Sequence, residues 1–351
     1  MTRSKSYIAT PPGFTIKEQL KDRGMSQKEF ASRMAMSEKH ISNLINGAVQ
    51  LTHEVANRLE MVLGVPAKFW NNLETIYREK LVKIESENSM EADVEFAKKL
   101  PYKKMADNGW VPKTNRVGEK VVELRKFFET VELELLFKHD LIPKIACRRQ
   151  AVTEKADYAL IVWAQKAKLE ARQIDVSPIN LEHLTNLLPE IRKMTLMVPE
   201  EFAPKLVKVL ADCGVALVFL PHIENSFLNG ATFFDKKKVV LGLTVRGRDA
   251  DKFWFSLFHE IGHILLGHLS QTGTSEKDEF ESDEFAKEQL IPAQQLEAFT
   301  AGRSTFSQSD IIGFARQIEI DPGIVVGRLQ KEGFIKFNWH NELKTKYEIS
   351  A

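Results

Sequence analysis

The sequence predicts a mostly α-helical protein with one small α+β unit. Near the N-terminus, Ser26 and Ser37 each precede a short segment with the residue pattern of a capped helix. Apolar residues then recur with helical spacing through much of the range 90–199. Beyond Pro199, three short β-type runs lead directly into a long apolar helix, which is the order of elements expected of an α+β unit.

The length of 351 residues predicts two or three domains, each able to bury its own core. We predict a helix-turn-helix domain over 1–85, a helical connecting region over 86–199, an α+β domain over 200–295 and a C-terminal helical extension over 296–351. The polar run 85–93 predicts a linker, and the polar run 271–279 predicts a loop.

Composition restricts the surroundings in which the chain works. The 49 basic residues nearly balance the 48 acidic ones, so any binding to nucleic acid depends on a local surface. The cysteines, Cys147 and Cys213, form no C-x-x-C pair, which argues against a disulfide framework or a thiolate metal site. No apolar stretch follows Arg3 and Lys5 as in a secretory signal. These features predict a cytoplasmic protein with no membrane partner.

The first motif lies in the N-terminal segment. Ser26-Gln-Lys-Glu29 is a capping box, in which the serine and the glutamate side chains satisfy free backbone donors at a helix start. A break at 35–36 follows, and Ser37 caps a second helix that runs to Gly47. Two short helices at this spacing match helix-turn-helix geometry.

The second of these helices has one face suited to DNA. Its apolar residues face inward, which leaves polar side chains of the kinds that read a DNA groove exposed: Lys39, His40, Ser42, Asn43 and Asn46. The local charge is only weakly positive, so electrostatics alone does not decide for DNA binding. An ordinary helical hairpin remains an alternative.

A family resemblance favours DNA binding. Ser26 to Ala31, Met36 to Gly47 and Leu51 to Pro66 resemble the Xre-type fold of HigA-like antitoxin regulators. The resemblance implies that Gln27 touches a phosphate and that Lys39, His40 and Asn43 read bases. It also implies a homodimer on double-stranded operator DNA, because such modules pair to span two half-sites.

The second motif lies in the predicted α+β domain. Strands are predicted over 215–220, 232–234 and 239–243, with a hairpin turn over 235–238 between the last two. A helix over 249–268 follows, and it contains His259-Glu-Ile-Gly-His263. On a helix these histidines lie one turn apart and can share a zinc ion, while Glu260 can take a proton from a water held by that ion.

The surroundings of this motif strengthen the prediction of a metal. The helix is otherwise almost entirely large and apolar, so its titratable groups are buried and need partners. A pair of core histidines bonded to Glu260 is the alternative, but it gives no reason for the second histidine.

The residues alone leave the third ligand open. His268 is five residues beyond His263, and on a continuous helix it points away from the other two. Several acids crowd the next helix, most of them on a solvated face: Asp278, Glu279, Glu281, Asp283, Glu284 and Glu288. Periodicity does not choose among them, because candidates flank both edges of its buried face.

A second family resemblance implies which acid is the third ligand. Asp251 to His268 and Glu281-Ser-Asp-Glu-Phe-Ala286 are similar to the ImmA/IrrE family of metallopeptidases, which implies a zincin-like domain with a short β-sheet. In that family the first glutamate of the second motif is the third ligand, a position that Glu281 occupies. The range 246–249 and the C-terminal range 318–329 also look like the family.

The sequence therefore predicts a DNA-binding regulator with a zinc-dependent endopeptidase domain that cleaves a regulatory protein partner, with Glu260 as the base. The alternative is a HigA-like antitoxin or repressor whose metal domain senses a ligand or a toxin partner without proteolysis. Hydrolysis of a non-peptide bond also stays open. His222 and Arg246 are candidates for stabilising an oxyanion, although a surface role fits each of them better.

Overall fold

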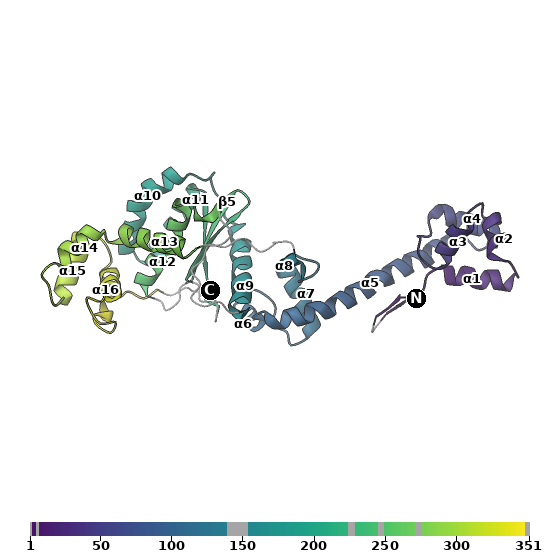
Figure 1. The fold of residues 1–351 in the computed structure, drawn as a ribbon, viewed down its shortest axis with the longest axis horizontal. Coiled ribbons are helices and arrows are strands. Elements are labelled where there is room, and N and C mark those ends of the chain that lie inside the picture. The colour runs from purple at the N-terminus through teal and green to yellow at the C-terminus, as the bar shows by residue number, and fades with distance from the viewer. Residues whose placement is uncertain are drawn as a thin grey trace. The chain divides into compact units, whose positions relative to one another are not determined.

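The computed structural model describes residues 2–4, 7–138, 154–223, 229–244, 249–270 and 275–347. The chain divides into two compact units, Met1–Glu95 and Phe96–Ala351 (Figure 1). No described helix is long and apolar enough to cross a membrane.

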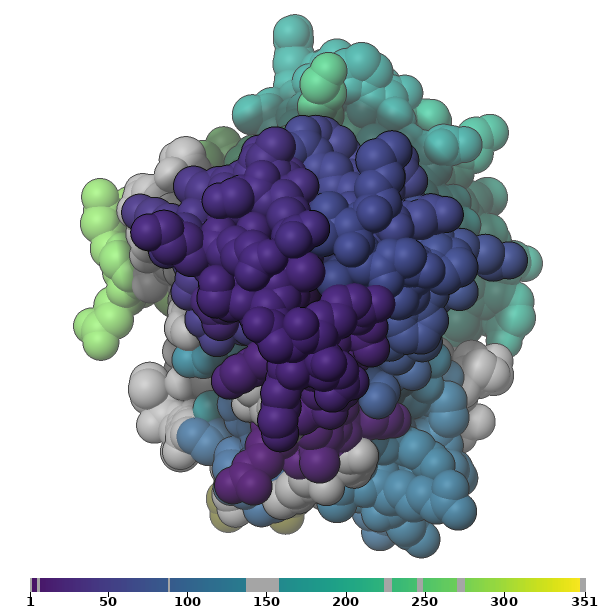
Figure 2. Space-filling model, turned by 90° about the vertical axis from the view of Figure 1, so that its right-hand side faces the viewer, coloured from purple at the N-terminus to yellow at the C-terminus, as the bar shows by residue number. Residues whose placement is uncertain are grey.

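The N-terminal unit is a helical bundle preceded by a small hairpin. Its elements are β1 (Thr2–Arg3), β2 (Ile8–Ala9), α1 (Gly13–Asp22), α2 (Gln27–Arg33), α3 (Glu38–Ile45), α4 (His53–Leu63) and α5 (Ala67–Lys99). Apolar residues from α1 to α4 and Trp70 of α5 form one buried core. Figure 2 faces this unit, whose residues are coloured purple to blue.

Serine caps define the two helices of the motif. The Oγ atom of Ser26 accepts from the backbone N–H of Glu29 at 3.1 Å, and the Oγ atom of Ser37 accepts from that of His40 at 3.2 Å. The predicted capping box forms only in half, because Glu29 pairs with Arg33 one turn later, at 2.8 Å. Ala35, with φ of 51°, makes the break between the helices.

The polar run 85–93, which the sequence predicts to be a linker, is helical. It lies inside α5, which continues from Ala67 to Lys99. The run is rich in Glu, Ser, Asn and Asp, but it contains neither proline nor glycine, so nothing in it stops a helix.

The second unit consists of helices around a three-stranded sheet. Before the sheet come α6 (Tyr102–Asp107), α7 (Val117–Phe127), α8 (Leu135–Lys138), α9 (Glu154–Ala171), α10 (Leu181–Lys193), a 3-10 turn (Met194–Leu196) and α11 (Pro199–Asp212). The sheet contains β3 (Val215–Leu220), β4 (Gly230–Asp235) and β5 (Lys238–Thr244). After it come α12 (Ala250–Leu265), a 3-10 turn (His268–Ser270), α13 (Glu276–Leu290), α14 (Ala293–Thr300), α15 (Gln308–Gln317), α16 (Pro322–Lys331) and a 3-10 turn (Asn341–Leu343).

The sheet has the strand order β3-β5-β4. β3 runs parallel to β5, and β4 and β5 form the predicted antiparallel hairpin, with Lys236 at φ of 58° in its turn. The β4–β5 register pairs Gly230 with Leu243 and Ala231 with Gly242. Directly paired residues share a face of the sheet, and successive residues alternate between faces.

Different helices cover the two faces of this sheet. A Cβ atom on Gly242 would lie 2.3 Å from the Trp163 ring of α9, so Gly242 lets that helix lie directly against the sheet. A Cβ atom on Gly230, on the opposite face, would meet Glu260 of α12 at 2.8 Å. The sheet therefore lies between α9 and α12, and α9 packs with the domain that follows it.

The helix that carries the histidines ends earlier than predicted. α12 is apolar and almost wholly buried, as its sequence indicates, but it stops at Leu265. Gly267, at φ of 77°, then turns the chain back into the 3-10 turn that starts at His268. This early end changes where His268 lies, as described below.

Candidate metal centre

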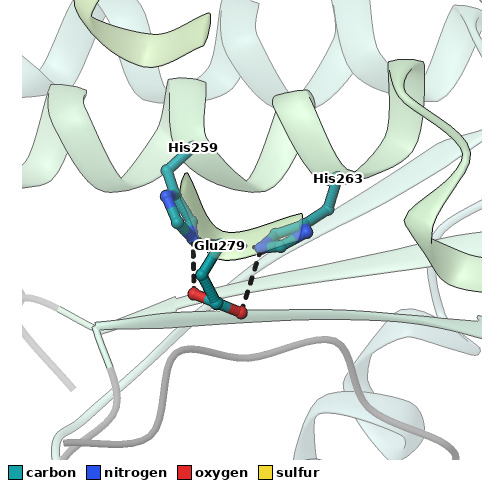
Figure 3. Close-up of side chains that lie close together, drawn as sticks. All are labelled: His259, His263 and Glu279. Atoms are coloured by element: carbon teal, nitrogen blue, oxygen red, sulfur yellow. Dashed lines mark hydrogen bonds and ion pairs between the residues drawn. The ribbon is translucent and has the colours of Figure 1, made fainter. Parts of the chain in front are cut away.

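Two imidazoles and one carboxylate converge between α12 and α13. The Nε2 atoms of His259 and His263 lie 3.0 Å apart. The carboxylate of Glu279 approaches both, at 3.4 Å from His259 Nε2 and 3.5 Å from His263 Nε2 (Figure 3). Both imidazoles are buried, at 4% and 0% exposed. The predicted pairing of the two histidines is thus present, with an acid from the next helix beside it.

The carboxylate in this position is not the predicted one. Glu281 instead faces a third imidazole, that of His268, with Oε2 of Glu281 3.3 Å from Nε2 of His268. The side chain of Glu281 is 41% exposed. His268, Asp278 and Glu281 form a second group of metal-ligand residue types, separate from His259, His263 and Glu279. Glu279 therefore replaces Glu281 as the candidate third ligand.

The helical repeat explains this exchange. Ser282, Asp283 and Ala286 face α12, and a residue three or four positions earlier lies on the same stripe. Glu279 lies three residues before Ser282 and four before Asp283, whereas Glu281 lies only one and two residues before them. Gly262 brings the two helices together, since a Cβ atom there would lie 3.3 Å from Cα of Ser282.

The three donors fit a zinc ion. In a tetrahedral site with bonds of about 2.0–2.1 Å, neighbouring ligand atoms lie ~3.3 Å apart. The two Nε2 atoms lie 3.0 Å apart, and each lies 3.4 or 3.5 Å from a different oxygen of the Glu279 carboxylate, which are distances close to that value. Three protein ligands of the types N, N and O also leave a fourth position for water, as in catalytic zinc sites.

A second layer of contacts orients each imidazole. Nδ1 of His259 lies 2.8 Å from Oδ1 of Asp283, so that nitrogen holds the proton and Nε2 is left to bind an ion. Nδ1 of His263 lies 3.1 Å from the Ser282 hydroxyl and 3.0 Å from Nδ1 of His268. His268 thus does not point away from the site: it touches the nitrogen of His263 that faces away from Glu279.

The predicted base lies beside the donors. Glu260 is 2% exposed, and its carboxylate accepts a hydrogen bond from the hydroxyl of Thr232 on β4. Burial raises the pKa of Glu260 to about 7, although the charge of His259 and the bond from Thr232 act against this rise. A carboxyl group with a pKa near neutrality can both take up and release a proton.

The two histidines differ in their proton affinity. Burial lowers the pKa of His263 to about 4, which keeps its imidazole neutral, as a metal ligand must be. Burial also acts to lower the pKa of His259, but its bonds with Asp283 and Glu279 outweigh burial and raise that pKa to about 9. The carboxylates around His259 therefore favour positive charge where an ion would sit.

The other predicted site residues are distributed as follows. In the N-terminal unit, Gln27 and Lys39 are exposed, whereas His40 and Asn43 are half-buried. Nε2 of His40 is buried, so that atom is not available to a base. His222 is half-buried just beyond the end of β3, and Arg246 lies outside the described residues.

Sequence reasoning missed several functional side chains. Asp283 and Ser282 orient the imidazoles, Thr232 holds Glu260, and His268 contacts His263. The spacing of Glu279, Ser282, Asp283 and Ala286 was a signal for the third ligand. Thr232 and His268 gave no such signal, because their contacts depend on the sheet register and on the turn at Gly267.

Two family models match the chain. Residues 16–70 match a helix-turn-helix model, and residues 230–329 match the model of the IrrE N-terminal-like domain, a peptidase family. The second match begins at β4, includes the metal cluster and continues through α16. The regions between and around these matches are not covered by either model.

Two individual proteins are similar to a part of the chain. An uncharacterized HTH-type transcriptional regulator, YddM of Escherichia coli strain K12, is 35% identical over 66 residues, which are 19% of this chain and 70% of that protein. An addiction module antidote protein of a HigA family from Coxiella burnetii is 28% identical, with a TM-score of 0.22, over 24% of this chain and 92% of that structure.

Proposed function

We propose that this chain, which belongs to the helix-turn-helix family of DNA-binding regulators and carries an IrrE-like metallopeptidase domain, is a zinc-dependent endopeptidase that cleaves a regulatory protein partner. The observation that carries the proposal is the convergence of His259, His263 and Glu279 beside a buried carboxylate, Glu260.

The roles of the residues follow from their positions. His259, His263 and Glu279 would hold the ion, and Asp283 and Ser282 would fix the tautomers that expose each Nε2 atom. When bound, zinc would supply a Lewis acid that polarises a carbonyl group and lowers the pKa of water. Glu260, positioned by Thr232, would take the proton from the attacking water and deliver it to the leaving amine.

The DNA-binding module gives the peptidase a location. Such modules bind as pairs to two half-sites, so we propose a homodimer on operator DNA, with Gln27 on phosphate and Lys39 and Asn43 at base edges. His40, whose Nε2 atom is buried, does not read a base through that atom. The cleaved protein would then be one that acts at the same promoter. We propose a cytoplasmic location for this role.

The test combines metal analysis with a cleavage screen. Wild type, His263→Ala and Glu260→Gln are purified, their zinc content is measured, and each is incubated with the proteins encoded beside its gene. We expect zinc in wild type and Glu260→Gln, none in His263→Ala, and cleavage by wild type alone. Removing the base should slow cleavage by about 10²–10⁴-fold.

Two outcomes would contradict the proposal. Retained cleavage by Glu260→Gln would remove that residue from the chemistry. Operator binding that is unchanged by chelation, with no cleavage of any neighbouring protein, would instead favour a repressor or antitoxin whose metal domain senses a ligand or partner.

A further inference from the structure

A cavity of about 640 Å³ opens beside the metal cluster. One wall is the site itself, with His259 and Glu260 from α12 and Gly230 from β4. A second wall comes from α16 and the segment after it, including Arg328, Lys331 and Lys346. The volume lies in the range of about 300–1,000 Å³ that is usual for ligand sites, so the cavity suits a short peptide segment.

This second wall is basic. Lysines 252, 287 and 344 line the cavity but are each neutralised by a carboxylate, through Asp249 at 2.8 Å, Glu284 at 2.6 Å and Asp251 at 2.8 Å. Lys331 and Lys346 also line it, are exposed, and lie more than 4.0 Å from every carboxylate among the described residues. Their positive charges therefore face the cavity with no such neutralisation.

Arg328 adds a partly buried charge to this wall. Its side chain is only 15% exposed, and its Nε atom lies 3.1 Å from Oε1 of Glu332. Its Nη1 atom is buried and has no hydrogen-bond acceptor within the described parts of the chain. A guanidinium group has five N–H donors, and burying such donors without acceptors is costly. A carboxylate entering the cavity would supply acceptors in the planar geometry that arginine binds best.

Apolar side chains also line the cavity, among polar ones such as Asn229, Ser256 and Gln330. Phe255, Leu290, Ile291, Ile324 and Phe337 contribute side chains to the same cavity. A ligand that matches this lining has apolar groups and at least one carboxylate. An extended peptide with acidic and apolar side chains has both, and its backbone can reach Glu260.

We propose that this cavity selects peptide segments that carry an acidic side chain near the scissile bond, with Arg328 as the residue that binds the carboxylate and with Lys331 and Lys346 supporting it. The inference rests on the proposed peptidase function. Arg328 is a specificity-determining residue here, because it contacts a part of the substrate that does not react.

The test measures binding separately from cleavage. Octapeptide pools are made with either Glu or Gln fixed at one position and with mixed residues at the others. The peptides are acetylated at the N-terminus and amidated at the C-terminus, so the two pools differ only in the side-chain carboxylate at the fixed position. Their binding to the full-length Glu260→Gln protein is measured by fluorescence anisotropy. We expect Glu pools to bind at least about tenfold more tightly than Gln pools at one or more positions, as a charge-assisted contact predicts.

Variants assign the preference to the basic wall. Arg328→Gln, added to Glu260→Gln, should remove the Glu preference and leave binding of the Gln pools unchanged. Arg316→Gln is the matched control, since Arg316 is exposed on α15 and does not line the cavity. Because Arg328→Gln replaces a partly buried residue, Lys331→Gln with Lys346→Gln provides a second, exposed pair, which should reduce the preference and its dependence on salt.

Each result has a definite meaning. Equal binding of Glu and Gln pools, or a Glu preference that survives both sets of variants, would overturn the inference. Wild-type protein incubated with the same pools reports on the proposed function separately. Cleavage without a Glu preference would support the proposed peptidase function and contradict the proposed acidic specificity. Preferential binding of Glu pools with no cleavage by wild type would contradict the peptidase function and support a carboxylate-binding site.

Discussion

Nδ1 of His263 lies 3.0 Å from Nδ1 of His268. A hydrogen bond between two imidazole nitrogens needs a proton on one of them only, so the two tautomers are coupled. If Nε2 of His263 binds an ion, its Nδ1 carries the proton and donates it towards His268 or Ser282. The Nε2 atom of His268 then holds a proton that faces Glu281 at 3.3 Å. His268 and Glu281 therefore belong to the support of the metal site.

We predict that His268→Gln weakens zinc binding while His259, His263 and Glu279 remain in place. Losing an outer-layer partner of a metal-bound histidine typically costs about 10–100-fold in metal affinity or activity. The measurement is competition for zinc against a chromophoric chelator. His183→Gln is the control, because His183 is exposed on α10. Equal affinities for the two variants would remove His268 from the support of the site.

A matched pair of variants on α13 separates the candidate third ligand from its neighbour. Glu279→Gln removes a carboxylate that lies 3.4 and 3.5 Å from the two Nε2 atoms, whereas Glu281→Gln changes a side chain that contacts His268 and Lys277 and not the two Nε2 atoms. We expect Glu279→Gln to lose zinc affinity by more than the roughly 100-fold upper range of an outer-layer change, and Glu281→Gln to lose less. Zinc titration of both proteins compares them.

The reverse order of these two affinities would restore the ligand that the family resemblance implies, Glu281, and would mean that α13 rotates when the ion binds. Thermal unfolding of both variants without zinc controls for a change in packing. Both side chains are replaced by an amide of the same shape, so the comparison isolates the charge.

The sequence predicted the local elements of both units well, because their signals are local. The serine caps at Ser26 and Ser37, the hairpin of β4 and β5 and the buried helix α12 each depend on a few neighbouring residues. The end of α12 and the continuous helix α5 were less predictable. A glycine such as Gly267 either ends a helix or is tolerated inside one, and the polar run 85–93 differs from a linker in extended conformation only in lacking a helix breaker.

Prediction of the metal site was limited by the helical phase of α13. The H-E-x-x-H pattern fixes His259, Glu260 and His263 from within one helix, and the structure brings them together as expected. The third ligand depends on how α13 is rotated about its axis, and a shift of two residues moves a side chain by roughly 200° around a helix of 3.6 residues per turn. The contacts of Ser282 and Asp283 with the imidazoles fix that rotation. The spacing of Glu279 from these two residues indicates that the three share a stripe of α13, but it does not show that this stripe faces α12.

The contact between Gly230 and Glu260 predicts a way to disturb the base without touching a ligand. A Cβ atom at residue 230 would lie 2.8 Å from Cγ and from Oε1 of Glu260, so Gly230→Ala must displace that buried side chain. We expect peptide cleavage to fall by at least about tenfold while zinc content is unchanged. Gly313→Ala is the control, because nothing lies within 4 Å of its added Cβ atom. Loss of zinc from Gly230→Ala would show that the strand supports the ligands as well.

The exposure of the N-terminal residues predicts different effects on DNA binding. Gln27 and Lys39 are exposed, whereas Asn43 is half-buried and Nε2 of His40 is buried. If Gln27 contacts phosphate, Gln27→Ala should weaken binding to all sequences alike. If Asn43 reads a base edge, Asn43→Ala should cost about 1–3 kcal/mol on the preferred sequence and little on others. Selection from a random duplex library, followed by anisotropy titrations at several salt concentrations, measures both effects. Loss of specificity from Gln27→Ala but not from Asn43→Ala would mean that the second helix does not enter the groove as proposed.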